Sequence, residues 1–143
     1  MCSSDLIIPI GVADVKRVGA DITIVSFGKI IKEAYKAADE LIKEGISVEI
    51  IDLRTVRPLD HDTIIESVKK TNRLVILEEA WPFGSVSTEI TYRIQDEAFD
   101  YLDAPIKRIT TADTPAPYSP VLLEAWIPNS KDVIKAVKEV LNK

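Results

Sequence analysis

The sequence alternates between apolar runs of strand length and longer stretches with a helical spacing of apolar residues. The runs that predict strands cover residues 13–19, 21–28, 47–55, 73–80 and 106–112. The stretches that predict helices cover residues 30–45, 62–72, 86–98 and 131–141. Strands that alternate with helices are typical of a parallel sheet with right-handed crossovers. We therefore predict an α/β fold, an open twisted mostly parallel sheet of about five strands with one antiparallel edge strand and helices on both faces.

Polar residues mark the expected ends of these elements. Asp60 is expected to cap the second helix, and Ser85 or Gly84 to open the third. Ser130 is expected to cap the last helix. The segment 112–130 carries four of the eight prolines, so we predict that it is mostly irregular.

Composition narrows the class of protein. The chain has 143 residues and a net charge of −5, whereas nucleic-acid-binding surfaces are basic. It contains one cysteine, Cys2, so neither an internal disulfide nor a cysteine zinc set can form. No apolar run is long enough to span a membrane, and the N-terminus lacks the pattern of a secretory signal. We therefore predict a single-domain cytoplasmic protein that binds neither nucleic acid nor membrane.

The first residues do not fit this pattern. The letters MCSSDL precede the first apolar run, and Cys-Ser-Ser-Asp-Leu is what the end of a common sequencing adapter would encode. We therefore interpret residues 1–7 as a non-native leader and residues 8–143 as the domain, and we expect the natural chain to continue upstream. An intact longer reading frame that contains these letters would contradict this interpretation.

The carboxyl ends of the predicted strands are the first place to look for a site, because open α/β sheets bind ligands there. The strand at 21–28 ends in SFGK, which is neither a dinucleotide-binding motif nor a P-loop. His61, the only histidine, lies in the first turn of a predicted helix with no nucleophile nearby in the sequence. We therefore predict no nucleotide site, and we interpret His61 as a solvated residue rather than a general base.

Two adjacent carboxylates, Glu78 and Glu79, end the predicted strand at 73–80 and look like a catalytic pair. Side chains alternate between faces in a strand, so these two carboxylates converge poorly on one substrate, as an acid/base pair must. Trp81 and Phe83 follow, and aromatic side chains are common interface anchors. A single glutamate at the strand end could instead accept hydrogen bonds from backbone amides of a neighbouring loop. We therefore predict a structural or subunit-interface role for these four residues rather than a catalytic one.

Several motifs occur together in a specific order. They are IDLRTVRPLD (51–60), EEAW (78–81), LDAP (102–105) and DTPAPY (113–118). With these motifs, the sequence from Ile8 to the end resembles the C-terminal domain of the β subunit of the E1 component of 2-oxo acid dehydrogenase complexes, most closely that of pyruvate dehydrogenase. The resemblance implies a transketolase C-terminal-like fold, which agrees with the predicted alternation of strands and helices.

The resemblance also implies where the chemistry of the parent enzyme lies. In this family thiamine diphosphate binds between subunits, and a G-D-G-containing motif of the α subunit holds its diphosphate and Mg²⁺. The glutamate that activates the cofactor and a catalytic histidine belong to the N-terminal domain of the β subunit. This sequence has no G-D-G and no counterpart of that N-terminal domain, so we expect no catalytic, cofactor-binding or metal-binding residue in it and no activity from it alone. The parent enzyme would decarboxylate pyruvate oxidatively and acetylate the lipoyl groups of E2 reductively.

For the C-terminal domain the resemblance implies two tasks. One is association of an α2β2 heterotetramer, through the α subunit and a second β subunit, and the other is docking of the basic subunit-binding domain of E2. In related bacterial assemblies docking uses an acid in L-[DE]-A-P, a second acid four residues later and the terminal carboxylate. These positions are Asp103, Lys107 and Lys143 in this sequence. Lys107 departs from the pattern, because a lysine repels a basic partner, and a plain turn residue is the alternative interpretation of Asp103.

Two other interpretations stay open at this point. The chain could be the C-terminal domain of another thiamine enzyme, such as a branched-chain 2-oxo acid dehydrogenase, a transketolase or a deoxyxylulose-phosphate synthase. It could also be a free-standing α/β binding module. A deoxyxylulose-phosphate synthase is not expected to carry the tail that contains LDAP and DTPAPY. This domain does not separate pyruvate from branched-chain 2-oxo acids, because the residues that contact the substrate lie in other parts of such enzymes. A natural start codon and a stable monomeric chain would favour the free-standing module.

Overall fold

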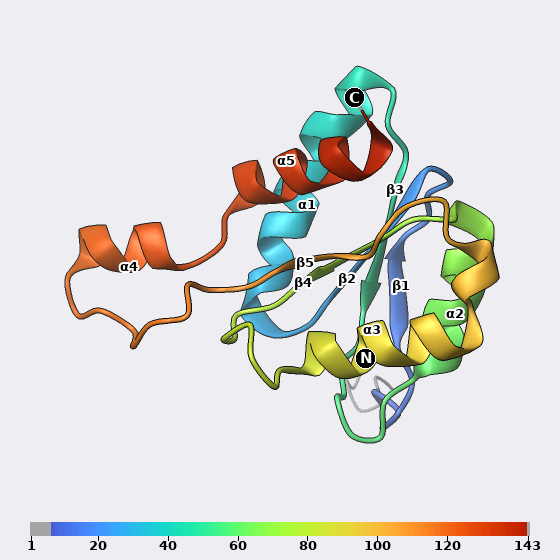
Figure 1. Ribbon diagram of the computed structural model, residues 1–143, viewed down its shortest axis with the longest axis horizontal. Helices are drawn as coiled ribbons and strands as arrows, with labels where there is room; N and C mark the ends of the chain where they lie inside the picture. The colour runs from blue at the N-terminus through green and yellow to red at the C-terminus, as the bar shows by residue number, and fades with distance from the viewer. Residues whose placement is uncertain (1–6, 143) are drawn as a thin grey trace, which may run out of the picture.

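The computed structural model describes residues 7–142, which form a five-stranded sheet with helices on both faces (Figure 1). The strands are β1 (Asp14–Arg17), β2 (Ile22–Ser26), β3 (Val48–Asp52), β4 (Leu74–Leu77) and β5 (Lys107–Ile109). The α-helices are α1 (Ile31–Leu41), α2 (His61–Thr71), α3 (Val86–Glu97), α4 (Pro120–Trp126) and α5 (Ser130–Leu141). Short 3-10 turns occur at η2 (Gly28–Ile30), η3 (Ile42–Glu44) and η4 (Phe99–Tyr101). The predicted leader lies outside the described residues, apart from Ile7.

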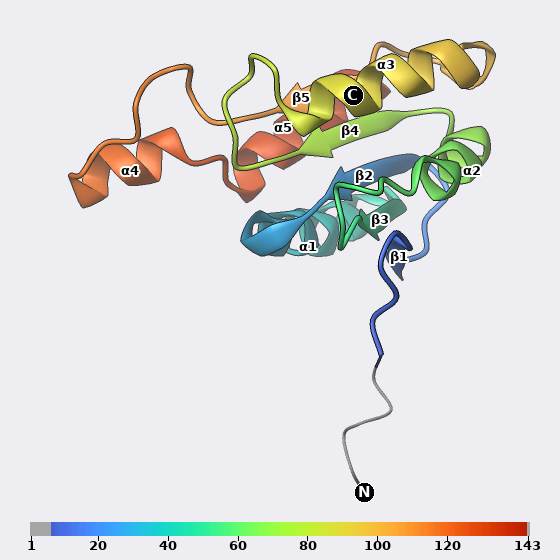
Figure 2. The same cartoon turned by 90° about the horizontal axis from the view of Figure 1, so that it is seen from below.

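The sheet has the strand order β1-β3-β2-β4-β5. All pairs are parallel except the pair of β1 with β3, which is antiparallel and forms one edge. This order confirms the predicted mixed sheet. α1 and α5 cover one face and α2 and α3 cover the other (Figure 2). The connections from β2 and from β4 leave toward opposite faces, so the carboxyl ends of these two central strands form the topological switch point.

Each face of the sheet has its own apolar core. Every residue of β2 and of β4 is buried, as expected for parallel strands that are covered on both sides. Ile24, Ile50 and Val75 pack against α1 and α5. On the other face, Val25 and Ile76 pack against α2 and α3. The unbroken apolar runs of the sequence are therefore a consequence of burial on both faces.

The cap of the last helix differs from the prediction. Asn129, not Ser130, is the N-cap residue of α5. The Asn129 side chain accepts a hydrogen bond from the Lys131 N–H at 2.9 Å, and Asp132 accepts one from the Asn129 N–H at 2.9 Å. This is a capping box, and it places the helix start one residue earlier than predicted. Asparagine and serine are both good caps, so the sequence alone did not separate the two positions.

The segment between β5 and α5 extends away from the body of the molecule (Figures 1 and 2). We name residues 112–127 the arm, and no residue of this range is buried. The segment is mostly irregular, as predicted, except for Pro120–Trp126, which form the seven-residue helix α4. A proline fits the first position of a helix because the N–H that it lacks has no intrahelical partner there.

Candidate functional site

Glu78, the first of the two adjacent carboxylates, lies just beyond the end of β4 and is 0% exposed. Its backbone N–H donates to the Ile109 carbonyl at 3.0 Å, which continues the pairing of β4 with β5. Its carboxylate accepts hydrogen bonds from the Ser87 N–H at 3.1 Å and from the hydroxyls of Ser85 and Ser87. The negative charge therefore lies at the N-terminus of α3, where it complements unpaired N–H groups and the helix dipole.

Arg108 completes this arrangement from the neighbouring strand β5. Its Nε donates to Ser87 Oγ at 2.7 Å, and one Nη donates to Ser85 Oγ at 3.2 Å and to the Pro82 carbonyl. Two serine hydroxyls thus connect a buried carboxylate to a guanidinium. We name Glu78, Ser85, Ser87 and Arg108 the capping cluster. A buried charge is stable only with such partners, so the cluster holds the fold at the end of the sheet.

The capping cluster changes the interpretation of two predicted residues. Ser85 is the N-cap residue of α3, as predicted, but its side chain bonds no N–H of the helix. Glu78 makes that bond from a different element. The prediction that Glu78 helps to shape a subunit interface stays a prediction. Because the Glu78 side chain is 0% exposed, any such role acts through the β4–α3 loop that it holds, not through contact with a partner. The bond from the Ser87 N–H agrees with the prediction that a glutamate at this strand end accepts from a backbone amide. Sequence analysis missed the role of Arg108, whose partner Ser87 lies 21 residues away in the chain.

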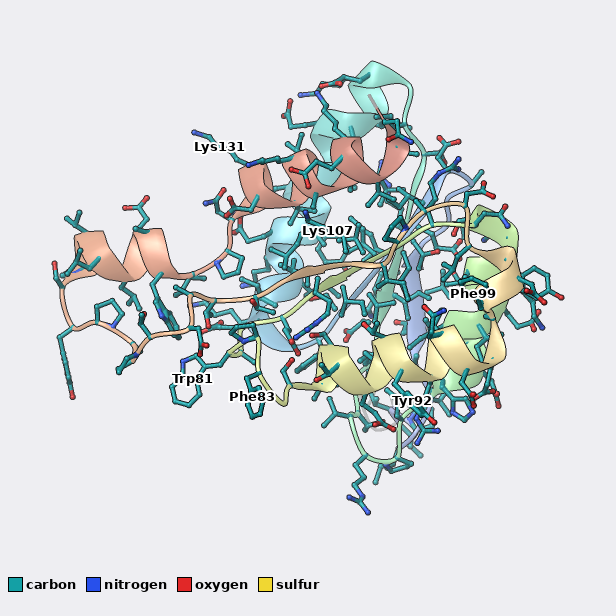
Figure 3. The ribbon with its side chains drawn as sticks, viewed as in Figure 1. Trp81, Phe83, Tyr92, Phe99, Lys107 and Lys131 are labelled. Carbon is teal, nitrogen blue, oxygen red and sulfur yellow. The ribbon has the colours of Figure 1, made fainter. Side chains whose placement is uncertain are left out.

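The β4–α3 loop exposes the other three predicted interface residues. Glu79 is exposed, and Trp81 and Phe83 are 54% and 91% exposed. Figure 3 shows both aromatic side chains at the base of the arm. The Trp81 indole N–H donates to the Thr114 carbonyl at 3.0 Å, and the Trp126 indole donates to the same carbonyl at 3.1 Å. The first bond ties the loop to the arm, and the second closes the arm on itself.

A crevice lies beside the topological switch point. Its lining includes Lys29, Lys32, Glu79, Glu124, Ile127 and Pro128. None of its lining residues is a histidine, cysteine or serine, so it presents no hydroxyl or thiol nucleophile beside a histidine base. Within residues 7–142, no group of three His, Cys, Asp or Glu side chains is arranged to hold a metal ion. No helix in that range is both long and apolar enough to cross a bilayer.

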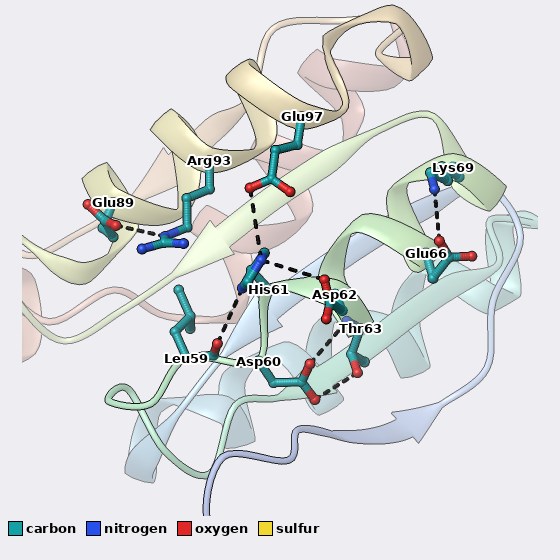
Figure 4. Close-up of polar contacts among 10 residues, drawn as sticks. All are labelled: Leu59, Asp60, His61, Asp62, Thr63, Glu66, Lys69, Glu89, Arg93 and Glu97. Carbon is teal, nitrogen blue, oxygen red and sulfur yellow. Dashed lines mark hydrogen bonds and ion pairs between the residues drawn. The ribbon is translucent and has the colours of Figure 1, made fainter.

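His61 lies half-buried between α2 and α3 (Figure 4). Its Nε2 is 3.5 Å from a carboxylate oxygen of Asp62 and 3.9 Å from one of Glu97, and its Nδ1 is 3.5 Å from the Leu59 carbonyl oxygen. Asp60 beside it is the N-cap of α2, as predicted. The ring is less solvated than predicted, but these neighbours give it no nucleophile to activate.

A second buried carboxylate, Glu49 in β3, is 2% exposed. It accepts hydrogen bonds from the Gly19 N–H at 3.1 Å, from Ser67 Oγ at 2.5 Å and from the Lys70 ammonium. Burial raises the pKa of Glu49, but these hydrogen bonds outweigh it and hold the pKa below the ordinary 4.5. Glu49 therefore links the β1–β2 turn and α2 to the sheet, and it serves the fold as Glu78 does.

Two of the predicted docking residues, Asp103 and Lys107, lie just before β5 and at its first residue. Asp103 is exposed, and its carboxylate is 3.3 Å from the guanidinium of Arg73. Lys107 forms an ion pair with Glu139 of α5 at 2.5 Å, and this hydrogen bond lowers the pKa of Glu139. Lys143 lies outside the described residues. Asp103 and Lys107 therefore do not share a site with the β4–α3 loop, which follows the carboxyl end of β4.

Comparison with known proteins gives several matches. Residues 11–133 match the family model of the transketolase C-terminal domain. The pyruvate dehydrogenase E1 component subunit beta of Rhizobium meliloti (strain 1021) is 54% identical over 139 residues, which are 97% of this chain. The acetoin:2,6-dichlorophenolindophenol oxidoreductase subunit beta of Bacillus subtilis (strain 168) is 46% identical over 134 residues, or 94% of this chain. The chain spans 30% and 39% of the lengths of these two relatives.

The fold also has a close counterpart among solved structures. A structure described as a split gene transketolase, inactive beta4 tetramer, is 27% identical with a TM-score of 0.86 and covers 99% of this chain and 46% of that chain. The resemblance to pyruvate dehydrogenase E1 β subunits is confirmed by the relatives, and the predicted fold is confirmed by the sheet order and by this neighbour. Because the family model spans most of the sequence, this chain belongs to the transketolase C-terminal domain family.

Proposed function

We propose that this chain is the C-terminal domain of the β subunit of a thiamine-diphosphate-dependent pyruvate dehydrogenase E1, and that it serves assembly rather than chemistry. The observation that carries this proposal is the 54% identity with such a β subunit along 97% of the chain. The described residues support an assembly role, because the buried carboxylates hold the fold while aromatic and aliphatic side chains face outward. The parent enzyme would decarboxylate pyruvate and acetylate lipoyl groups on E2.

The described residues do not fit thiamine diphosphate or its Mg²⁺. A diphosphate needs clustered N–H groups and cations, and Mg²⁺ needs several oxygen ligands. The crevice at the switch point instead presents Glu79 and Glu124 beside its lysines, and residues 7–142 hold no group of three metal-ligating acidic, histidine or cysteine side chains. The cofactor of the parent enzyme would therefore bind to its other domains and subunits.

The proposed assembly includes contact with the α subunit and with a second β subunit. The neighbour of TM-score 0.86 is described as a beta4 tetramer, which supports association of β chains with one another. We therefore expect this chain to associate with a second copy of itself.

The proposed docking of E2 uses the surface around Asp103. This carboxylate is exposed, and an exposed ion pair such as that with Arg73 contributes at most about 1 kcal/mol, so a basic partner can replace it. Lys107 is paired with Glu139, so it repels a basic partner less than the sequence indicates. Calorimetric titration with the E2 subunit-binding domain should show binding that weakens at high salt. Asp103→Asn should weaken it about tenfold, whereas the exposed control Asp96→Asn should not.

A chimera tests the proposed function directly. Residues 8–143 replace the matching domain of the Rhizobium meliloti β subunit, and the chimera is co-expressed with the α subunit of that organism. We expect an α2β2 assembly that decarboxylates pyruvate when thiamine diphosphate and Mg²⁺ are supplied. A folded chimera that fails to bind the α subunit would contradict the assembly role.

A further inference from the structure

β5 forms one edge of the sheet, and within residues 7–142 no strand lies on its outer side. Ile109 and Thr111 turn their backbone groups toward β4, since the Ile109 carbonyl and the Thr111 N–H each bond the β4 side at 3.0 Å. Backbone direction alternates along a strand, so the N–H and C=O groups of Arg108 and Thr110 face the open side. A row of unpaired backbone groups is a template on which another extended segment can pair.

A groove follows this open edge between β5 and α5. Its lining includes Lys107, Arg108, Ile109 and Thr110 from the edge, Trp126 and Pro128 from the end of the arm and its junction with α5, and Asp132, Lys135, Ala136 and Glu139 from α5. The groove therefore has backbone donors and acceptors along one wall and the side of a helix along the other. A segment that pairs with the edge would place alternate side chains against α5.

The charged side chains of the groove indicate which segment it fits. Lys107 is paired with Glu139 at 2.5 Å, and Asp132 belongs to the capping box of α5. The guanidinium of Arg108 is bound within the capping cluster. The remaining charge of the lining is the ammonium of Lys135, which is exposed and has no ion pair within the described residues. The groove therefore attracts an acidic side chain, because complementary charges select the partner of a surface.

The lysine on the edge strand also acts on the choice of partner. A lysine at a sheet edge usually prevents pairing with another chain. Lys107 does this for a basic or apolar segment, whereas a carboxylate opposite Lys107 forms a favourable cross-strand pair. The groove thus differs in chemistry from the exposed carboxylate of Asp103, which suits a basic partner.

We propose that the groove along β5 is a docking site for an extended acidic segment of a partner protein. The segment adds a sixth strand to the sheet, with its backbone paired to Arg108 and Thr110. One of its acidic side chains lies against Lys135. The site goes beyond the proposed function and does not depend on it, because the E2 domain of that proposal is basic.

Titration of the complete ¹⁵N-labelled chain with a short synthetic peptide tests the inference by NMR. The peptide is about eight residues long, has blocked ends and alternates threonine with glutamate. We expect saturable shifts and slower exchange at the amides of Arg108 and Thr110. Lys135→Glu should raise the dissociation constant at least about tenfold. The matched control Lys131→Glu makes the same charge change outside the groove lining, on the side of α5 away from β5, and should raise it less than about twofold (Figure 3).

Two further peptides separate the causes of binding. One alternates threonine with lysine and should not bind, and the other carries N-methylated amides, which cannot pair with the edge, and should bind at least about tenfold more weakly than the first. The inference would be overturned by a folded chain that does not respond to millimolar acidic peptide. Equal weakening by Lys135→Glu and Lys131→Glu would overturn it as well, and so would equal binding of any of the three peptides. A chimera that still assembles after such a result would leave the proposed function intact.

Discussion

The central sheet and the arm use their side chains in opposite ways. In the sheet, every residue of β2 and β4 is buried, and the charged side chains Glu49 and Glu78 are enclosed by hydrogen-bond donors. In the arm, no residue from 112 to 127 is buried. The indole N–H groups of Trp81 and Trp126 both donate to the Thr114 carbonyl. The contrast teaches that the two buried carboxylates maintain the fold, whereas the arm leaves apolar side chains such as Tyr118 and Leu122 exposed.

The largest expected effect lies in the capping cluster. Glu78→Ala leaves Arg108 and the hydroxyls of Ser85 and Ser87 without their shared acceptor. Removal of one member of a buried charged pair costs about 3–5 kcal/mol, and we expect a loss of that order in the free energy of unfolding, measured with urea. The matched control is Glu79→Ala next to it, which is exposed and should change stability by less than about 0.5 kcal/mol. Equal losses from both variants would remove the distinction between the two carboxylates.

Ionisation of Glu49 should make the free energy of unfolding depend on pH. Burial raises the pKa of Glu49, but the hydrogen bonds from Lys70, Ser67 and Gly19 hold it below the ordinary 4.5. The stability that ionised Glu49 contributes is therefore fully present above pH 4.5 and is lost as the pH falls through the lower pKa of the folded state. Glu49→Gln should lower the free energy of unfolding by about 1–3 kcal/mol at neutral pH. The variant should then lose less additional stability than the wild type as the pH falls.

Urea unfolding from neutral to acid pH measures this effect. Asp62→Asn is the control, because that side chain is 86% exposed and should keep the wild-type slope. A Glu49→Gln variant that loses stability in acid as steeply as the wild type would show that Glu49 is not the group responsible.

A smaller effect is expected where the arm closes. Trp126→Phe removes the indole donor to Thr114, a hydrogen bond that contributes about 1 kcal/mol. Because this bond closes only the arm, amide exchange should become faster within residues 112–127 while the free energy of global unfolding stays the same. Tyr118→Phe is the control, since it keeps the ring and removes no bond of the arm. Faster exchange in β2 or β4 would mean that the arm is part of the cooperative body.

The smallest effect on stability is expected at the exposed centre of the arm. Leu122→Asp should change the free energy of unfolding of the dilute chain by less than about 0.5 kcal/mol, because the side chain is already 58% exposed. Urea unfolding at low protein concentration measures it. A loss of several kcal/mol would show that the arm packs against its own chain.

Elements whose signals are local could be predicted from the sequence. The unbroken apolar runs at 22–26 and 74–77 indicated strands that are covered on both faces, and Asp60 indicated the start of α2. These signals depend on burial and capping within a few residues of the element itself. The mixed, mostly parallel sheet could be predicted from the alternation of strands and helices along the chain.

Contacts between distant elements could not be predicted in the same way. Glu78, just beyond the end of β4, caps α3 at Ser87 nine residues later, and Arg108 reaches the same serine from β5. Such contacts depend on strand order and on side-chain direction, which no local pattern contains. The same reason explains why Thr114 joins two tryptophans that belong to different elements.

Hydrogen–deuterium exchange of the wild-type chain at low and high protein concentration compares the two regions in one measurement. In the dilute chain, amides of β2 and β4 should exchange slowly and those of residues 112–127 quickly. If the chain associates through the predicted interface residues Trp81 and Phe83, exchange in the β4–α3 loop should slow at high concentration, while the sheet should not change. Contradiction would come from an arm that is as protected as the sheet in the dilute chain, because the two regions would then not differ.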